Sequence, residues 1–360
     1  MVVTQDPRST YPQNVLDLVS TDPQLRNAIP LPELSPPFPA DEDRTYQELI
    51  EAITRGYADR PAIGTRAYRI GPDPLTGQSS RIFLPEFNTI SYGELNARIK
   101  KLAAIWQSDP AYRVDPGDFV CIIGFSGIDY VTVELACAYA QAASVPLQAA
   151  LGSHLTTIFA KTAPTCVAAT IDDIVVAAEM AAAHSTVRTV IAFDYDSAVD
   201  ADREQLATAR AILARGNPGT ALITLGELLD QCGGVWRPLP ASPQRTARIA
   251  VLIHSSGSTG EPKGAILTEA STMWLWSATP QVPLVRVVFA PMNHQVGRGK
   301  IFSSLARGGT AYITAKPDLS ELFTDIKLVR PTELIILPRV MEMIHRHFLG
   351  EVIRRGDGRE

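Results

Sequence analysis

The sequence has few cysteines and no long hydrophobic run. Its four cysteines form no Cys-x-x-Cys pair, and no cysteine and histidine residues have zinc-finger spacing. It has no apolar run of about 18 residues, which a membrane-spanning helix would need, and it does not begin with the basic and then apolar pattern of a secretory signal. We therefore expect a protein of the reducing cytoplasm, without disulfides, a zinc site or a membrane span.

An excess of positive charge is also missing. Lysine and arginine number 33 against 38 aspartates and glutamates, which gives a formal net charge of −5. A general nucleic-acid-binding protein needs a strong basic field, so the charge balance disfavours that class. Hydrophobic residues make up 46% and charged residues 20%, proportions typical of a soluble globular protein. A chain of this length buries about 75% of its unfolded surface, enough for a core without covalent staples.

The order of predicted elements indicates an α/β fold. Residues 1–44 are rich in proline and predict an extended leader. Beyond residue 91, short apolar strands alternate with helices, which is typical of a mostly parallel sheet covered on both faces. The polar stretch 194–245 contains many helix and strand breakers and predicts a boundary. We therefore expect two stacked, mostly parallel sheet subdomains with helices on their faces, at 45–245 and 246–360.

Local signals predict particular elements within this pattern. The turn signal at Gly71–Gly77 and its alternating flanks predict a hairpin over residues 66–88. Ser91 followed by Glu94 predicts a capping box at the start of a helix. Near the end of the second series, residues 333–337 predict a further strand.

A loop rich in glycine and hydroxyl side chains follows the predicted strand at 248–253. Its residues are Ser255, Ser256, Gly257, Ser258, Thr259, Gly260, Glu261, Pro262, Lys263 and Gly264. Glycines let the backbone approach a ligand closely, hydroxyls and successive N–H groups can donate to an anion, and Lys263 adds a positive charge. The loop is a candidate phosphate site, and the alternative is a flexible linker. It is not a Walker A loop, which would have glycine at 262 and serine or threonine at 264.

A second candidate segment, Ala290–Arg298, follows a predicted strand and opens a predicted helix. It contains His294. A neutral imidazole can donate one hydrogen bond, and a protonated one adds charge stabilisation. His294 is therefore a candidate catalytic residue, and the alternative is an ordinary packed histidine at a helix start.

These two segments resemble those of a known family. The loop Ser255–Gly264 looks like the phosphate-binding signature of the adenylate-forming superfamily, which includes acyl-CoA synthetases, luciferases and peptide-synthetase adenylation domains. The segment Ala290–Arg298 is similar to the motif that places a histidine or aromatic residue at the acyl pocket. Where the family often has Tyr-Thr before the signature, this chain has His254 and Ser255.

Further stretches resemble bacterial carboxylic acid reductases in particular, in the order in which that family has them. They are Gly56–Ala62, Gly117–Val120, Asp129–Tyr130, Val145–Ala149, Phe193–Tyr195, Leu305–Tyr312 and Leu328–Glu333. Together these stretches extend over nearly the whole chain. The resemblance thus predicts the N-terminal part of the adenylation domain of a carboxylic acid reductase.

The resemblance implies a chemistry. In such reductases the adenylation part uses MgATP to convert a carboxylic acid to acyl-AMP, a phosphopantetheine thiol on a carrier domain captures the acyl group, and a reductase domain uses NADPH to release an aldehyde. Here the loop Ser255–Gly264 would bind the β- and γ-phosphates of ATP. Lys263 would be a point charge there, and His294 would face the acyl-adenylate and the α-phosphate. The resemblance assigns no metal ligand among these residues.

Other motifs of the family are not in the sequence. There is no Tyr-Gly-x-Thr-Glu or Thr-Gly-Asp motif, no C-terminal catalytic lysine motif, no carrier serine motif and no GxGxxG fingerprint. We therefore expect an incomplete adenylation domain that is inactive alone, lacks the carrier and reductase domains, and self-associates through an exposed sheet edge. The alternatives are a fragment of a fatty-acyl-CoA or peptide-synthetase-type ligase, and a non-catalytic nucleotide-binding or interaction remnant.

Overall fold

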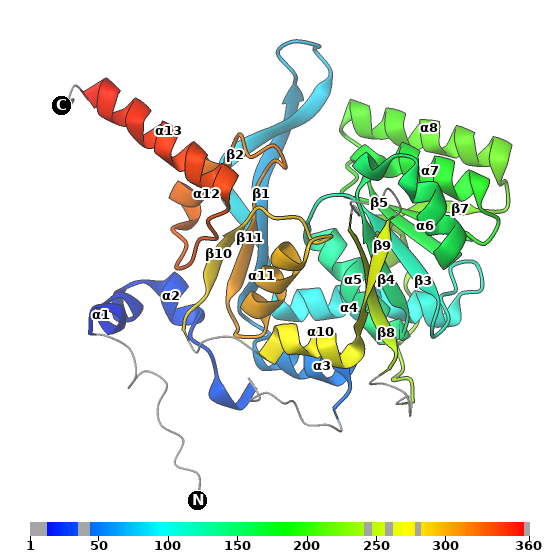
Figure 1. Cartoon of the computed structure of the whole chain (residues 1–360), viewed down its shortest axis with the longest axis horizontal. Helices are drawn as coiled ribbons and strands as arrows, with labels where there is room; N and C mark the ends of the chain where they lie inside the picture. Colours follow the sequence, from blue (N-terminus) through cyan, green and yellow to red (C-terminus); the bar gives the residue numbers. More distant parts are fainter. Residues whose placement is uncertain (1–12, 35–43, 241–246, 256–261, 278–281, 356–360) are drawn as a thin grey trace, which may run out of the picture.

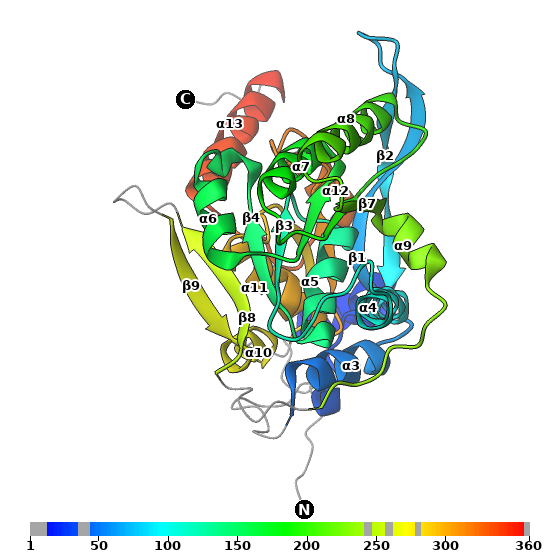
Figure 2. The ribbon, with the colours of Figure 1, turned by 90° about the vertical axis from the view of Figure 1, so that its right-hand side faces the viewer.

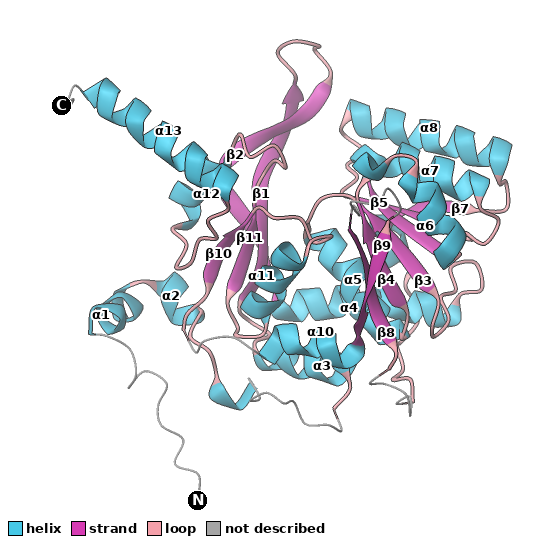
Figure 3. Cartoon of the chain, in the orientation of Figure 1, coloured by secondary structure: helices cyan, strands magenta, loops and turns pink. Residues whose placement is uncertain are grey.

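A computed structural model shows an α/β fold built around two sheets (Figures 1 and 3). It describes residues 13–34, 44–240, 247–255, 262–277 and 282–355. The predicted fold of two stacked, mostly parallel sheets with helices on their faces is confirmed. None of the helices in the described ranges has both the length and the apolar character that crossing a membrane requires.

The larger sheet contains seven strands of the described chain. They are β3 (Phe119–Ile123), β4 (Ala143–Leu147), β5 (Cys166–Thr170), β6 (Thr189–Phe193), β7 (Ala221–Thr224), β8 (Ile249–Ser255) and β9 (Lys263–Thr268). Their order is β7-β6-β5-β3-β4-β8-β9, and all neighbours are parallel except the antiparallel pair β8–β9. Figure 2 shows this pair at one edge of the sheet.

The smaller sheet contains four strands of the described chain. They are β1 (Pro61–Pro72), β2 (Ser79–Ser91), β10 (Val285–Val288) and β11 (Thr310–Ile313), in the order β10-β11-β1-β2. The pair β1–β2 is antiparallel and the other two pairs are parallel. The hairpin predicted over residues 66–88 is therefore confirmed.

Helices cover both faces of the larger sheet because its strands are apolar on both sides. One face is packed by α4 (Tyr92–Ser108), α5 (Ile128–Ala140) and α9 (Leu225–Gln231), and the other by α6 (His154–Thr162), α7 (Ile174–Ala183) and α8 (Asp200–Gly216). Strand β3 shows the reason, because its side chains alternate between two hydrophobic cores. Val120 and Ile122 belong to the core that includes α4, α5 and α9, whereas Cys121 and Ile123 belong to the core that includes α6, α7 and α8.

The remaining α-helices belong to the leader or pack around the smaller sheet, with one exception. They are α1 (Gln13–Thr21), α2 (Pro23–Asn27), α3 (Tyr46–Gly56), α10 (Glu269–Ser277), α11 (Gln295–Leu305), α12 (Leu322–Val329) and α13 (Pro338–Arg355). The exception is α10, which contacts β8 and β9 of the larger sheet. In Figure 1, α5 and α11 lie between the two sheets, while α12 and α13 lie on the far side of the smaller sheet. The surface of the larger sheet that α5 covers is called its inner face below, and the surface that α6 covers is its outer face.

Strand pairing crosses the boundary predicted at residue 245. Strands β1 and β2, from before it, pair with β11 in the smaller sheet, whereas β8 and β9, from after it, extend the larger sheet beside β4. The split between the sheets therefore does not coincide with the predicted split of the chain.

Three local predictions also differ from the structure. The stretch 194–245 was expected to be irregular, but it contains α8, β7 and α9; α8 is largely polar because it buries only a narrow stripe against the core. Residues 263–268 were not predicted as a strand, yet they form β9. Residues 333–337 form no strand within the described chain, where Glu333 makes only an isolated bridge to Arg286.

Candidate functional site

The candidate site lies at the carboxyl ends of the central strands of the larger sheet. Strands β3, β4 and β8 are parallel, so they end at the same edge, and ligands of open α/β sheets bind outside this edge. Ser126 follows β3, and Gln148 follows β4. Strand β8 leads directly into the predicted phosphate loop.

Much of that loop falls outside the described part of the chain. The predicted site residues outside it are Ser256, Gly257, Ser258, Thr259 and Gly260. The structure does place the two ends of the loop, since Ser255 ends β8 and Lys263 and Gly264 begin β9. The assignment of the loop as a phosphate site therefore stays a prediction.

The register of β8 and β9 separates Lys263 from His254. Ser255 lies opposite Lys263, and His254 lies opposite Gly264. Because successive residues of a strand point to opposite faces, Lys263 lies on the face of the sheet opposite to that of His254. His254 faces α6 on the outer face, so Lys263 is on the inner face, the one turned toward the smaller sheet.

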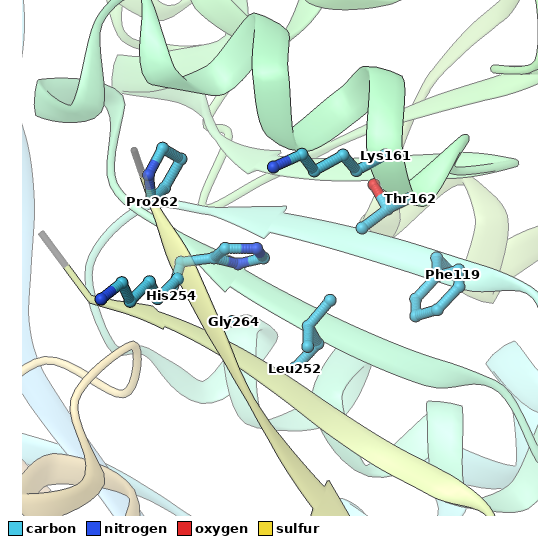
Figure 4. Close-up of a pocket in the computed structure, with 8 residues that line it drawn as sticks. Phe119, Lys161, Thr162, Leu252, His254, Pro262 and Gly264 are labelled. Carbon is cyan, nitrogen blue, oxygen red and sulfur yellow. The ribbon is translucent and has the colours of Figure 1, made fainter. Parts of the chain in front are cut away.

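His254 borders a pocket with a cavity volume of about 660 Å³, and Lys263, at the start of the edge strand β9, borders the same pocket. Figure 4 shows the imidazole of His254 between the side chains of Lys161, at the end of α6, and Leu252. Within the described ranges, the Nδ1 atom of His254 is buried and has no hydrogen-bond partner. Burial, and next the charge of Lys161, lower the pKa of His254 from its ordinary value, which favours the neutral imidazole.

Gly264 leaves room for this histidine. A Cβ at position 264 would come within 2.9 Å of Leu252 Cδ1 and within 3.2 Å of His254 Nε2. The glycine at this point of the signature therefore has a packing reason on the outer face. That reason is independent of its predicted place in the phosphate site.

The second predicted segment comes from the smaller sheet and reaches the same edge of the larger one. The Met292 N–H donates to Ser126 Oγ at 3.0 Å, and Gln148 Nε2 donates to Asn293 Oδ1 at 3.1 Å. His294 follows directly as the N-cap of α11, with an exposed side chain that makes no capping bond. Segments about 145 residues apart, at Gln148 and Asn293, thus meet where β3 and β4 end.

The strand register places Lys263 on the inner face, and the bonds of Met292 and Asn293 place the His294 segment at the carboxyl edge. Sequence reasoning missed Ser126 and Gln148, which hold the His294 segment in place. Their signal was position alone, because each follows a predicted strand of a parallel sheet.

A carboxyl group lies farther along the same edge, after β6. Asp194 has a left-handed backbone with φ of 56°, its N–H donates to Asp129 Oδ2 at 3.0 Å, and its carbonyl accepts from Arg81 Nη2 at 2.8 Å. The side chain of Asp194 is exposed to solvent on one side. Partial loss of hydration by the surrounding protein, and next the charge of Asp129, raise its pKa to about 8. In the described ranges, no group of three or more histidine, cysteine or carboxylate side chains has the arrangement of a metal site.

Comparison with known proteins defines the class. The family model described as AMP-binding enzyme matches residues 73–355, and the chain therefore belongs to that family. The superfamily resemblance carried by the loop and by the Ala290–Arg298 segment is thereby confirmed.

Particular relatives narrow this class to proteins similar to carboxylic acid reductases. The chain is 41% identical over 354 residues to a carboxylic acid reductase of Mycobacterium tuberculosis, across 95% of this chain and 29% of the relative. It matches the A-PCP didomain of the Segniliparus rugosus carboxylic acid reductase in complex with AMP at a TM-score of 0.89 and 36% identity, over 98% of this chain and 50% of that one.

A second solved structure agrees with this result. The A domain of the Segniliparus rugosus enzyme, in complex with AMP and a co-purified carboxylic acid, matches at a TM-score of 0.87 and 34% identity, over 98% of this chain and 57% of that one. The predicted resemblance to the adenylation domain of carboxylic acid reductases is confirmed. The chain spans less than a third of the length of the curated reductase it matches.

Proposed function

We propose that this chain carries the ATP- and acid-binding part of an enzyme that converts a carboxylic acid to acyl-AMP. The observation that carries the proposal is the docking of the His294 segment onto the edge where β8 leads into the glycine-rich loop. Relatives that bind AMP, and in one case a carboxylic acid, support it. The substrates are a carboxylic acid and MgATP.

The reaction is a displacement at phosphorus. A carboxylate oxygen of the acid attacks the α-phosphorus of ATP, the bond from that phosphorus to the bridging oxygen breaks, and the electron pair leaves with pyrophosphate. The protein contributes mainly by positioning and by stabilising negative charge. In this proposal Ser255–Gly264 bind the β- and γ-phosphates, and Lys263 supplies positive charge to them. His294 faces the α-phosphate and donates a hydrogen bond to the acyl-adenylate.

His294 has a suitable place for this role. It is the N-cap of α11, an eleven-residue helix whose first N–H groups and dipole favour negative charge. Its exposed imidazole is not used in a helix cap. A ligand at the carboxyl edge therefore finds a hydrogen-bond donor and a positive helix end in the same place.

The later steps of a reductase are part of the same proposal. A phosphopantetheine thiol on a carrier domain would capture the acyl group, and a reductase domain would use NADPH to release the aldehyde. The A-PCP didomain relative supports a carrier as the partner. We expect the 360-residue chain alone to form no aldehyde, since its sequence contains neither a carrier serine motif nor a GxGxxG fingerprint.

The first test is nucleotide binding by the purified chain, measured by titration calorimetry. We expect ATP to bind and the Lys263→Ala variant to lose about tenfold or more in affinity, because a charge-assisted contact to phosphate contributes about 1.5–3 kcal/mol. Lys327→Ala on α12 is the matched control, since it removes an exposed lysine far from the loop. Equal losses in both variants, or no ATP binding by the wild-type chain, would contradict the proposal.

The second test separates activation from mere nucleotide binding. The exchange of labelled pyrophosphate into ATP is measured with a panel of carboxylic acids. It is measured for the chain alone and for the chain fused to the remaining part of a related reductase, and we expect at least one acid to support exchange. Binding without exchange in both forms would favour the alternative of a non-catalytic nucleotide-binding remnant. Transfer of the acyl group to coenzyme A in solution would favour the acyl-CoA ligase.

A further inference from the structure

The first turn of α11 and the loop before it form one unit. The His294 N–H donates to Pro291 O at 3.1 Å, and the Arg298 N–H donates to His294 O at 3.2 Å. Gly297 allows the loop to lie against the turn, because a Cβ there would come within 2.3 Å of Ala290 O and of Pro291 O. A side chain that fixes this turn therefore also fixes His294.

Arg298 fixes the turn to the larger sheet through a buried ion pair. Its side chain is 0% exposed, and its Nη1 donates to Oε1 of Glu134 on α5. Ser144 Oγ on β4 donates to the same carboxylate oxygen at 2.9 Å. Burial lowers the pKa of Arg298, but the charge of Glu134 and its hydrogen bond outweigh that effect and raise the pKa, so the guanidinium keeps its charge inside the protein.

The ion pair is poorly suited to stability alone. Buried polar atoms around it have no hydrogen-bond partner within the described chain, namely Nε and Nη2 of Arg298, Oε2 of Glu134 and the hydroxyl of Tyr130. Well-packed apolar residues of similar volume are often as stabilising as a buried ion pair, or more so, and unpaired hydrogen-bonding groups add to the cost. What the pair does provide is a directional link between α5 and the turn that follows His294.

We propose that Glu134 and Arg298 are a positioning pair that sets where His294 stands at the carboxyl edge of the larger sheet. This inference rests on the proposed function, in which His294 faces the α-phosphate and the acyl-adenylate. Neither residue touches the reacting atoms; both act through the first turn of α11. The bonds from Ser126 and Gln148 hold the preceding loop, and the ion pair holds the helix that follows it.

The experiment uses the double variant Glu134→Leu/Arg298→Met in the full 360-residue chain. It replaces both charges by apolar groups, so that no unpaired charge is left buried. The matched control is Arg66→Met/Asp325→Leu, which removes another buried ion pair, between β1 and α12, that has no bond to the His294 segment. Folding of each variant is checked by cooperative thermal melting.

The readout is the imidazole NMR signal of His294. The chain has six histidines, so selective labelling gives a short spectrum, and the His294→Gln variant identifies the signal by its loss. In the wild-type chain and in the control we expect AMP to shift this signal. In the double variant we expect the shift of His294 to be lost even at AMP concentrations that saturate the protein, which a merely structural role would not produce.

Other outcomes are distinguishable. A folded double variant whose His294 signal responds to AMP as in the wild type would overturn the positioning pair. If the double variant does not fold, Arg298→Lys takes its place, because it keeps the charge but replaces the planar fork by a single point donor; an unchanged His294 response there would overturn the pair equally. A wild-type chain that does not bind AMP, or binds it without a response of His294, contradicts the proposed function itself.

Discussion

The two histidines beside the larger sheet, His254 and His294, differ in how far their side chains are exposed to solvent. On the outer face, His254 is half-buried against α6, its Nδ1 has no hydrogen-bond partner among the described residues, and burial lowers its pKa. On the inner face, Lys263 is exposed at the beginning of β9, and His294 is exposed at a helix start at the carboxyl edge. The comparison teaches that nearness to a signature along the chain does not decide a role. In the proposed function, the register of β8 and β9 separates Lys263, which binds phosphate, from His254, which does not.

The largest expected loss of stability follows from breaking the buried ion pair between Arg298 and Glu134. Arg298→Met alone leaves the Glu134 carboxylate buried and unpaired, so we expect the free energy of unfolding to fall by about 3–5 kcal/mol. Urea denaturation would measure it. Adding Glu134→Leu should recover most of the loss, because no unpaired charge then remains. A single variant no less stable than the double one would show that the inner face does not depend on charge pairing.

Gly264→Val tests the outer face by overfilling it. The new side chain would meet Leu252 and His254, and we expect a loss of about 1–3 kcal/mol in the free energy of unfolding. Gly226→Ala on α9 is the matched control, since a Cβ there meets nothing within 4 Å, and a helical alanine should stabilise by about 0.5–1 kcal/mol. Similar effects of the two substitutions would argue against close packing at Gly264.

His254→Phe asks whether the outer histidine takes part in nucleotide binding. We expect unchanged ATP affinity and a change in the pH dependence of unfolding. The lowered pKa of His254 means that its contribution to stability is present above its ordinary value of 6.5 and is lost as the pH falls below it. The phenylalanine variant should therefore lose less stability between neutral and mildly acidic pH. A weaker affinity for ATP would place His254 in the phosphate site and remove the contrast between the faces.

The smallest expected effect is that of Asp194→Asn at the edge between the two faces. Asp194 has a raised pKa of about 8 against an ordinary 3.8, so its stabilising contribution is present below that ordinary value and is lost as the pH rises through about 8. Asparagine tolerates the left-handed backbone, and thermal melting at a series of pH values should show a flatter decline from acidic to mildly alkaline pH. An unchanged profile would contradict the raised pKa.

Local signals in the sequence were enough to predict much of the fold. The capping box was predictable because Ser91 and Glu94 satisfy each other's backbone groups within one turn. Strand β3 was predictable as an apolar run because it is buried on both faces. Helix α8 was not, since its mostly polar surface resembles a loop in composition. Strand β9 was missed because it is a mostly exposed edge strand, for which pairing with β8 rather than burial decides the structure.

The candidate site could be predicted only in part, because some of its residues are brought together by the fold rather than by a local signal. Lys263 and His294 stand out by residue type beside a signature, but Ser126 and Gln148 are unremarkable in the sequence. Their role comes from the parallel strands that bring their loops to one edge. The pairing of Glu134 with Arg298 depends on how α5 packs against α11, which no spacing along the chain encodes.

The register of β8 and β9 has a consequence for how the family's sequences can vary. Suppose one residue were deleted between Lys263 and Thr268 while the rest of β9 kept its partners. Lys263 would then lie opposite His254 and point toward α6 instead of toward the inner face. If Lys263 binds phosphate as proposed, insertions and deletions in this short strand should be tolerated only in pairs, because a single one would move the positive charge to the outer face.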